Sequence, residues 1–356
     1  MRVLLFSKYG SLGASSRLRS YQYLPYLSQK GFQVDISALF DNHYLEGFFS
    51  ARKRNPFEII RYYLKRGQWI SKIQSYDMIW IEYELFPWLP ATIENLIIRK
   101  HIPLIVDYDD AVFHRFDLSS NRLVRKLLGQ KFDHIMRSAS AVIVGNQYIA
   151  DRATSAGASS VVKIPTVVDL SKYRYTAKQK STVFTIGWIG TPHTAQYLRM
   201  IEPALKRIAA KYRIQFIGVG TGNLKIDGVP TESLKWSKIN EAKTLSSFDV
   251  GIMPLRDEPF ERGKCGYKLI QYMACGLPVV ASPVGANTEI VEHGRNGFLS
   301  SFKDQWIKAI EYLIRNPDKA QKMGKEGRRK VENSYCTQIT APKLFEVFRS
   351  VVRCRF

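Results

Sequence analysis

Short apolar runs rich in β-branched and aromatic residues alternate with longer, helix-length segments along the whole chain. Six runs of the first half predict strands, at 3–6, 34–39, 78–82, 103–108, 141–145 and 161–166. Four runs of the second half do the same, at 183–190, 213–220, 248–255 and 277–282. Segments such as 17–30 and 121–138 are long enough for single helices. Strands that alternate with helices favour parallel sheets covered on both faces, so the sequence predicts an α/β fold.

The polar stretch 169–182 separates the two series of strands. We therefore expect two doubly wound, Rossmann-like domains, at 1–168 and 183–335, joined by a linker at 169–182. The tail 336–356 carries one amphipathic helical pattern and no strand. In open α/β sheets ligands bind at the carboxyl ends of the strands, so a site is expected in the turns that follow them.

The charge balance is the unusual feature of the composition. The chain has 53 Lys and Arg against 31 Asp and Glu, a net charge of +22. This excess predicts a polyanionic partner, either nucleic acid, an anionic membrane or a phosphate-bearing ligand. Nucleic acid is the least favoured, because no helix-turn-helix, zinc-finger or RNP-type pattern occurs. No apolar run approaches the ~18 residues that span a bilayer, and the apolar start is too short for a signal peptide, so we expect a cytoplasmic protein.

A glycine turn follows the first strand, in "FSKYGSLGASSRLR" at 6–19. Its candidates for binding a ligand phosphate are Gly10, Ser11, Gly13 and Arg17. Glycines let backbone N–H groups approach an oxyanion, and a helix N-terminus adds a favourable dipole. We expect that helix near Arg17, capped by Ser15 and Ser16. Arg19 either contacts the same ligand or is solvated.

A second glycine turn opens the second domain, in "IGWIGTPHTAQYL" at 186–198. Gly190 ends the strand, and Thr191 and Thr194 are candidate N-caps. His193 lies beside the helix start, where it either contacts a ligand or has a structural role.

Acidic residues follow two strands of the first domain. In "VDYDDAVF", Asp107, Asp109 and Asp110 either bind a divalent metal, contact a substrate, or end the strand and cap the next helix. In "IEYELFP", Glu82 and Glu84 are two residues apart and are expected to point to one side. Salt bridges to basic side chains are the alternative to a binding role for this pair.

The stretch "GKCGYKLIQYMACGLPVVASPVGAN" at 263–287 predicts a helix, a tight turn and a buried strand. A helix over 264–275 would place Lys264 and Lys268 on one face, four residues apart. Gln271 follows Lys268 by three residues and could meet the same ligand. Gly-Leu-Pro ends the helix, because glycine suits the C′ position and proline cannot continue it.

The segment "KLIQYMACGLPVVASPVGANTEIVEHGRNGFL" at 268–299 resembles the donor-binding signature of retaining nucleotide-sugar glycosyltransferases of family four, which have the GT-B fold. Other matching pieces occur in the expected order: "GASSRLRSYQYLPYL", "YDD", "IPTVVD" and "IGWIGTPHT". The resemblance covers nearly the whole chain and is strongest over 183–299. It implies two Rossmann-like domains that face each other across a cleft, with the final helix returning to the first domain.

The resemblance also implies roles for individual residues. The donor would contact Gly10, Ser11, Gly13, Arg17, Gly190, Thr191, His193, Lys264, Lys268, Gln271, Gly285, Asn287 and Glu289. The acceptor would contact Glu82, Glu84, Asp109 and Asp110. Lys268 would neutralise the diphosphate leaving group, so Lys268, Asp109 and Asp110 are the candidate catalytic residues. The nucleotide sugar would be a co-substrate, and no metal or other cofactor is implied.

One departure from the family pattern concerns two glutamates eight positions apart, which correspond here to Gly263 and Gln271. A glutamine amide can still hydrogen-bond ribose hydroxyls. Glu258 or Glu261 could replace the first glutamate. The lost glutamates leave open a non-catalytic protein that binds a nucleotide sugar, and a sugar-nucleotide epimerase of the same fold is a further alternative.

The stretch "ARKRNPFEIIRYYLKRGQWISK" at 51–72 combines basic and apolar residues. A helix from Pro56 would place Phe57, Ile60, Tyr63 and Leu64 on one side and Arg61, Lys65 and Arg66 away from them. Such a helix either binds an anionic membrane or is an ordinary surface helix. Binding at the inner face of the plasma membrane would suit a lipid-linked acceptor. We therefore expect a retaining, metal-independent transferase of cell-surface polysaccharide synthesis, with a glycan or lipid-linked acceptor.

Overall fold

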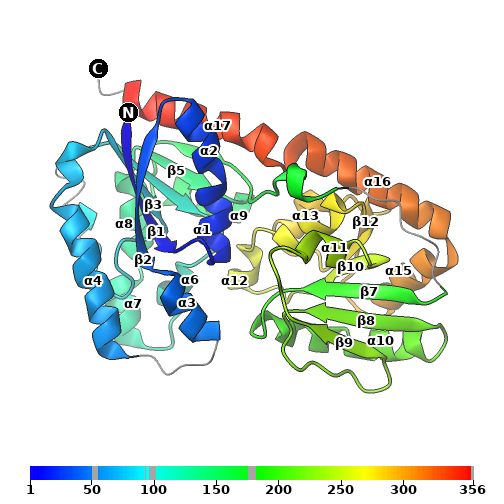
Figure 1. The fold of residues 1–356 in the computed structure, drawn as a ribbon. Coiled ribbons are helices and arrows are strands. Elements are labelled where there is room, and N and C mark those ends of the chain that lie inside the picture. The colour runs from blue at the N-terminus through cyan, green and yellow to red at the C-terminus, as the bar shows by residue number, and fades with distance from the viewer. Residues whose placement is uncertain (50–54, 93, 96–101, 175–181, 354–356) are drawn as a thin grey trace. The chain divides into compact units, whose positions relative to one another are not determined.

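The computed structural model describes residues 1–49, 55–92, 94–95, 102–174 and 182–353. The chain forms two compact units, which we call unit 1 (1–166 with 340–356) and unit 2 (167–339). Each unit contains one six-stranded sheet in which every strand pair is parallel, with helices packed against the sheet (Figure 1). The predicted α/β class with two doubly wound sheets is confirmed.

The sheet of unit 1 has the strand order β2-β1-β3-β4-β5-β6. Its strands are β1 (Arg2–Tyr9), β2 (Gln33–Phe40), β3 (Met78–Glu82), β4 (Leu104–Tyr108), β5 (Ala141–Val144) and β6 (Val161–Lys163). Val3 of β1 pairs with Val34 on one side and with Met78 on the other. The central strands β1, β3 and β4 are apolar and buried, as expected for parallel strands covered on both faces.

Two segments of unit 1 that the sequence predicted as single helices are each divided into shorter helices. The helices of unit 1 are α1 (Ala14–Arg19), α2 (Leu24–Gln29), α3 (Asn42–Phe49), α4 (Pro56–Ile70), α6 (His114–Asp117), α7 (Arg122–Leu128), α8 (Lys131–Ser138), α9 (Gln147–Ser155), α17 (Thr337–Arg353) and the 3-10 turns η1 (Tyr21–Tyr23) and η2 (Ile73–Ser75). The prediction of single helices at 17–30 and 121–138 is wrong. Pro25 lies in the first turn of α2, where its missing N–H costs nothing, and a new helix starts there. Gly129 and Gln130 separate α7 from α8.

The sheet of unit 2 has the strand order β12-β11-β10-β7-β8-β9. Its strands are β7 (Phe184–Ile189), β8 (Ile214–Val219), β9 (Thr231–Leu234), β10 (Val250–Met253), β11 (Val279–Ala281) and β12 (Gly297–Leu299). The two edge strands, β9 and β12, were not predicted. The sequence of β9 is the polar, partly exposed "TESL", and β12 has only three residues, so neither shows the apolar run that marks a central strand.

Two apolar cores cover the two faces of this sheet. Val279 belongs to the core that includes α13, whereas its neighbour Val280 belongs to the core that includes α10 and α15. The helices of unit 2 are α10 (Glu202–Ala209), α11 (Glu241–Leu245), α12 (Pro259–Arg262), α13 (Tyr267–Ala274), α14 (Asn287–Ile290), α15 (Lys303–Arg315), α16 (Pro317–Ser334) and the 3-10 segments η3 (Leu170–Lys172) and η4 (Thr194–Met200). The expected linker, 169–182, includes residues 175–181, which lie outside the described residues.

The carboxy-terminal helix α17 packs on unit 1. The ring of Phe348 lies edge-on to Phe32, at 5.6 Å, and to Trp80, at 5.1 Å. Tyr23 and Thr340 share a hydrogen bond of 2.9 Å between their hydroxyls. Residues from the two ends of the chain therefore build one core (Figure 1).

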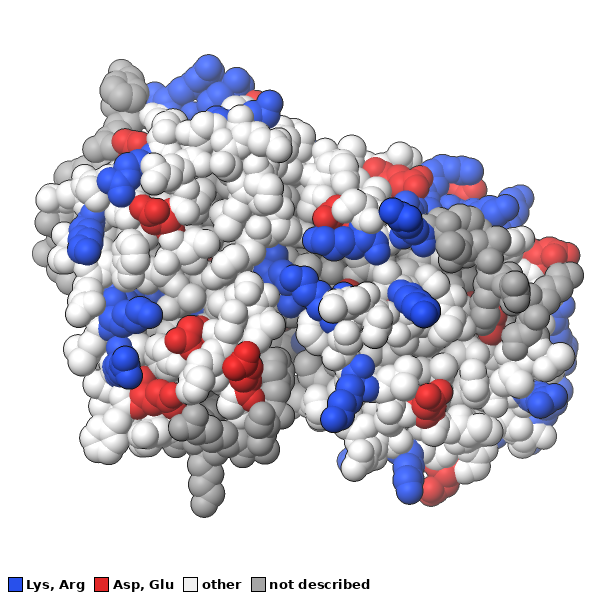
Figure 2. Space-filling model, in the orientation of Figure 1, with Lys and Arg blue, Asp and Glu red and all other residues white. Residues whose placement is uncertain are grey.

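Charged side chains of both signs occur on the face of the protein that Figure 2 shows. Figure 2 shows Lys and Arg distributed across this face and interspersed with Asp and Glu, without one dominant basic patch. Within the described ranges, no helix is both long enough and apolar enough to cross a membrane.

Candidate functional site

The carboxyl ends of three neighbouring strands bring most of the predicted donor residues together in unit 2. β10 pairs with β7 on one side and with β11 on the other. The loops that follow β7 and β11 therefore lie at the same edge of the sheet, where parallel α/β sheets bind their ligands. Helix α13, which connects β10 to β11, ends in the tight turn before β11.

The loop after β7 is a tight glycine turn. A side chain on Gly190 would collide with Trp188 and Thr194, at 2.3 and 2.8 Å. The Thr191 N–H donates to the Thr194 hydroxyl at 3.0 Å, which closes the turn before η4. His193 is exposed and immediately precedes η4. The loop is therefore a tight turn at the strand end, and the segment that follows it is a 3-10 helix.

Lys268 lies beside this loop. Its Nζ is 5.4 Å from the centre of the Trp188 ring, on β7. Tyr272, one turn further along α13, fixes this placement: its hydroxyl accepts the Ile189 N–H at 2.9 Å, and its ring packs where a side chain on Gly251 would collide at 2.2 Å. Glycine in β10 thus lets α13 approach the sheet closely and brings Lys268 to the carboxyl edge.

The predicted pairing of Lys264 and Lys268 on one helical face is wrong. Helix α13 begins at Tyr267, because Gly266 at φ 66° breaks the chain direction between the two lysines. Lys264 lies in the connection after α12, with its Nζ 4.6 Å from the Phe260 ring centre.

Gln271 is 3% exposed on the inner side of α13. Its Nε2 donates to the hydroxyl of Tyr173 at 3.1 Å, and that hydroxyl donates to Glu241 at 2.5 Å. The amide that was expected to meet a ribose thus takes part in a buried chain of hydrogen bonds.

The loop after β11 contains the second close approach. Gly285 has φ 50°, and a side chain there would lie 2.2 Å from the carbonyl oxygen of Arg262, at the end of α12. Asn287 is buried, and its Nδ2 donates to the Ser282 carbonyl at 3.0 Å, which closes the loop. Only glycine fits this contact, so the loop shape is set by Gly285.

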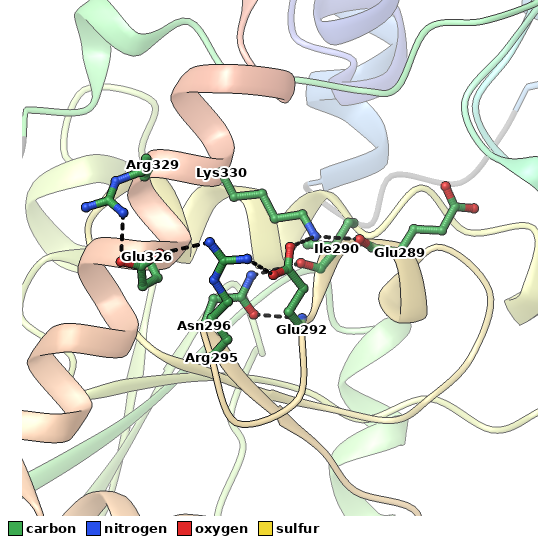
Figure 3. A network of polar contacts seen from close by, with 8 residues as sticks. All are labelled: Glu289, Ile290, Glu292, Arg295, Asn296, Glu326, Arg329 and Lys330. Carbon is green, nitrogen blue, oxygen red and sulfur yellow. Dashed lines mark hydrogen bonds and ion pairs between the residues drawn. The ribbon is translucent and has the colours of Figure 1, made fainter.

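Glu289 is exposed and lies in α14, directly after this loop. Figure 3 shows its backbone carbonyl accepting from Lys330 of α16, at 2.8 Å, while its carboxylate points away from the network. Lys330 also pairs with Glu292 at 2.7 Å, and Asn296 donates to the Ile290 carbonyl at 3.1 Å (Figure 3). These contacts anchor the segment that follows the loop to α16.

One of the two glutamates considered as a replacement for the lost family glutamate is a buried carboxylate close to this edge. Glu261 of α12 is 7% exposed and accepts a hydrogen bond from the hydroxyl of Tyr197, on η4. The pair ties α12 to the segment after the Gly190 loop. Burial and this carboxylate raise the pKa of Tyr197. Of the two glutamates considered as replacements at the lost position, Glu258 is exposed and Glu261 is buried.

In unit 1 the first glycine turn is held by Asn42, at the start of α3. The Asn42 Oδ1 accepts the Leu12 N–H at 3.0 Å, and its Nδ2 donates to the Ser11 hydroxyl at 3.1 Å. Side chains on Gly10 and Gly13 would collide with Asn42 and Tyr9, at 2.4 and 2.3 Å. The Arg17 Nη1 donates to the Leu12 carbonyl at 3.3 Å, so Arg17 also supports this turn.

Two expectations about the helix after this turn are wrong. Helix α1 begins at Ala14, and Ser16 lies inside it, with its hydroxyl directed to Glu82 at 2.5 Å instead of capping the helix. Arg19 is neither solvated nor exposed to a ligand: it is 2% exposed and its Nε pairs with Asp107 at 2.8 Å. Ser16 and Arg19 are three residues apart, so both lie on the inner face of α1, where they contact Glu82 and Asp107.

Glu82 and Glu84 do not point to one side. Tyr83 between them has φ 62°, so the alternation of a strand ends at Glu82. Glu82 accepts from Ser16 and from the Lys8 N–H at 2.9 Å, whereas Glu84 pairs with the buried Lys131 at 2.7 Å. Both carboxylates are buried in ion pairs or hydrogen bonds within unit 1.

Asp109 and Asp110 follow β4 at the carboxyl edge of this sheet. Asp109 is 5% exposed, accepts a hydrogen bond from the Tyr83 hydroxyl, and packs against Gly145, where a side chain would lie 3.1 Å from the Asp109 Cα. Burial, together with the neighbouring charge of Asp110, raises the pKa of Asp109 to about 7. Asp110 is partly exposed.

Lys8 lies near this aspartate at the end of β1. Burial and the charge of Arg115 lower the pKa of Lys8, while nearby carboxylates that include Asp109 oppose that shift. Asp107 is engaged by Arg19 rather than gathered with Asp109 and Asp110. Among the residues that the structure describes, no group of three or more His, Cys, Asp and Glu side chains is arranged to hold a metal.

The raised pKa of Asp109 predicts a pH-dependent stability. Because the folded-state pKa, about 7, exceeds the ordinary value of 3.8, folding favours the protonated carboxyl, and this contribution is lost as the pH rises from that ordinary value to about 7. We expect Asp109→Asn to remove this dependence of the unfolding free energy on pH, while its amide oxygen can still accept the hydrogen bond from Tyr83. Between pH 5 and 7 the variant should gain about 2–3 kcal/mol relative to the parent, measured by urea unfolding.

Asp107 is present in both proteins, so its own titration cancels in that comparison. A difference between the two unfolding free energies that stays constant from pH 5 to 8 would contradict the raised pKa.

Comparisons with known proteins find similarity between part of unit 2 and a described family. Residues 180–316 match the family model "Glycosyl transferases group 1". The chain is 28% identical over 170 residues to alpha-maltose-1-phosphate synthase of Mycolicibacterium smegmatis, which covers 46% of this chain and 39% of that protein. The matched stretches span between 21% and 39% of the length of such curated relatives. These similarities support a glycosyltransferase of the group 1 family.

Solved structures resemble the chain over nearly its whole length. Sucrose-phosphate synthase from Thermosynechococcus elongatus has a TM-score of 0.75 at 16% identity, with 99% of this chain and 100% of that chain covered. Anabaena HepE, solved in complex with UDP-glucose, has a TM-score of 0.70 at 16% identity, with 98% and 100% covered. The shared fold is the GT-B fold of glycosyltransferases.

Proposed function

We propose that the protein is a glycosyltransferase that moves a sugar from a nucleotide-diphosphate donor to a hydroxyl of a glycan or lipid-linked acceptor. The observation that carries the proposal is the placement of Lys268. It lies beside Trp188 at the carboxyl edge of the unit 2 sheet, where the loops after β7 and β11 make two tight glycine turns. A fixed cation beside such turns is the arrangement that binds a diphosphate.

Unit 2 binds the donor in this proposal. Lys268 neutralises the charge that develops on the diphosphate as the glycosidic bond breaks, so it acts on the transition state as well as on binding. Gly190, Thr191 and Gly285 contribute backbone contacts, and His193, Lys264, Asn287 and Glu289 surround them. The buried Glu261 is the carboxylate that we place near the sugar, in the position of the lost family glutamate.

Unit 1 binds the acceptor. Asp109 and Asp110 contact and orient its hydroxyl. Gly10, Ser11, Gly13 and Arg17 form the turn that completes the donor contacts. Glu82 and Glu84 support this site through Ser16 and Lys131 rather than by direct contact.

The reaction proceeds with retention of the anomeric configuration and without a metal ion. The acceptor attacks from the face that the diphosphate leaves, and the departing phosphate oxygen accepts the proton of the acceptor hydroxyl. The protein works at the inner face of the plasma membrane, in the synthesis of a cell-surface polysaccharide.

A donor screen tests the proposal. UDP-glucose is the first donor to examine, because HepE, with the same fold, has been solved with it. We expect at least one nucleotide sugar to raise the melting temperature and to be hydrolysed slowly without an acceptor. NMR of the product should show the same anomeric configuration as the donor. Addition of a metal chelator should not change the rate of the reaction.

The outcomes separate the alternatives. Binding without hydrolysis or transfer would favour a non-catalytic nucleotide-sugar-binding protein. Conversion of the donor to its epimer would favour an epimerase. Stabilisation by nucleic acid and by no sugar nucleotide would refute the proposal.

A further inference from the structure

Helix α4 presents its apolar stripe to solvent. Phe57, Ile60 and Leu64 are 80%, 55% and 66% exposed, although their spacing of three and four residues is that of a buried face. Arg66, expected on the outside, is 1% exposed. The predicted grouping therefore fails at Tyr63, which turns inward, and at Arg66, which is buried.

Buried polar contacts fix the rotation of α4. The guanidinium of Arg66 donates to the carbonyls of Ser37 at 2.6 Å, Leu85 at 3.0 Å and Ser7, which anchors it beneath the helix. The hydroxyl of Tyr63 donates to the Pro87 carbonyl at 2.5 Å. With these residues turned inward, the helical period leaves Phe57, Ile60 and Leu64 outward.

A second exposed apolar set lies on α7. Leu123 and Leu127, four residues apart, are 62% and 59% exposed. Trp88 connects the two helices: it follows Pro87, which Tyr63 of α4 contacts, and its ring lies 5.2 Å from Phe116 of α6, the helix that packs on α7. Trp88 is 55% exposed at φ 68°, a backbone conformation that few non-glycine residues adopt.

Exposed basic side chains lie on the same two helices, α4 and α7, as the exposed apolar side chains. Arg61 and Lys65 are exposed on α4, and Arg122, Arg125 and Lys126 are exposed on α7. The only carboxylate in the sequence of these two helices is Glu58, which lies 3.8 Å from His43. We call these cations together with Phe57, Ile60, Leu64, Trp88, Leu123 and Leu127 the basic–apolar surface.

We propose that the basic–apolar surface docks unit 1 on an anionic lipid membrane. Apolar and aromatic side chains between basic ones match a membrane interface, where the apolar groups enter the headgroup region and the cations meet lipid phosphates. A second copy of the chain would bring like charges together. The inference rests on the proposed function in one respect, because it names how the enzyme would reach a lipid-linked acceptor.

Vesicle sedimentation tests the surface without any catalysis. The full chain should bind vesicles that contain phosphatidylglycerol, bind pure phosphatidylcholine vesicles weakly, and be released by high salt. Phe57→Gln/Ile60→Gln/Leu64→Gln should weaken binding by more than about tenfold. Arg122→Gln/Lys126→Gln should weaken it by about fivefold for each charge removed.

A matched control removes exposed apolar side chains elsewhere. Ile239 and Phe302 of unit 2 are 92% and 73% exposed, and Ile239→Gln/Phe302→Gln should leave vesicle binding unchanged. Circular dichroism and the thermal shift with UDP-glucose show whether each variant is folded and still binds donor.

Equal vesicle binding by the α4 variant and the control would overturn the inference. So would self-association that the α4 variant abolishes in a protein that binds no vesicles. If vesicle binding follows the prediction but no nucleotide sugar binds the parent protein, the docking surface stands and the proposed enzymatic function fails.

Discussion

Lys268→Ala should lower the rate of sugar transfer by about 10²–10³-fold, because it removes the cation that we place on the departing diphosphate. Its Nζ lies 5.4 Å from the Trp188 ring centre, held at the sheet edge by the contacts of Tyr272 with β7 and β10. Affinity for the free nucleoside diphosphate should fall by about 10–100-fold, the effect of losing one charge-assisted hydrogen bond. Calorimetric titration and initial rates measure the two effects.

Lys308→Ala provides the matched control, since Lys308 is exposed on α15 of the same unit. It should leave both quantities unchanged. Because α13 keeps its apolar inner face in Lys268→Ala, the variant should melt within a few degrees of the parent. Unchanged diphosphate affinity in Lys268→Ala would show that the donor site lies elsewhere.

Arg19→Met should destabilise unit 1 by about 3–5 kcal/mol, the cost of leaving a buried charge without its partner. Arg19 and Asp107 are both 2% exposed, and the guanidinium also donates to the Ile164 carbonyl at 2.7 Å. Burial raises the pKa of Asp107 to about 6, and Arg19 opposes that shift. Hydrogen exchange of peptides from β1 and β4 reports on unit 1 alone and measures the loss.

The pH dependence distinguishes this explanation from simple loss of packing. Without Arg19 the pKa of Asp107 should rise further, so the destabilisation should be larger at pH 8 than at pH 5. Arg19→Met/Asp107→Asn should recover part of the stability, because it removes the unpaired charge. Arg349→Ala, which breaks an exposed pair with Glu346 in unit 1, should cost less than about 1 kcal/mol. Equal losses in Arg19→Met and Arg349→Ala would contradict the role of the buried pair.

The glycine turns and Lys268 could be recognised from the sequence, because they depend on local order along the chain. A strand, a Gly-rich turn and a helix start identify the Gly10 and Gly190 loops, whose glycines leave no space for a side chain. The burial of Asp109 and the hydrogen-bond partners of Glu82 could not be predicted from the residues next to them in the sequence. Their partners, Tyr83 and Ser16, are brought to them by strand pairing and by the packing of α1.

Lys264 shows why spacing alone misled. Four residues separate it from Lys268, but Gly266 at φ 66° starts a new helix between them. Gln271 was expected to face a ribose. In the structure its amide donates to the buried hydroxyl of Tyr173, which is nearly a hundred residues away along the chain.

The spacing of apolar residues and the positions of turn residues are local features of the sequence. They determined the α/β class and the two series of parallel strands. They also placed the candidate donor loops at strand ends. Tertiary structure alone decided which amphipathic faces are buried. On α4 the apolar residues Phe57, Ile60 and Leu64 face outward, and Arg66 faces inward, where its guanidinium donates to three backbone carbonyls. Three hydrogen bonds from a buried guanidinium can outweigh the exposure of three apolar side chains, and only the folded unit brings those carbonyls together.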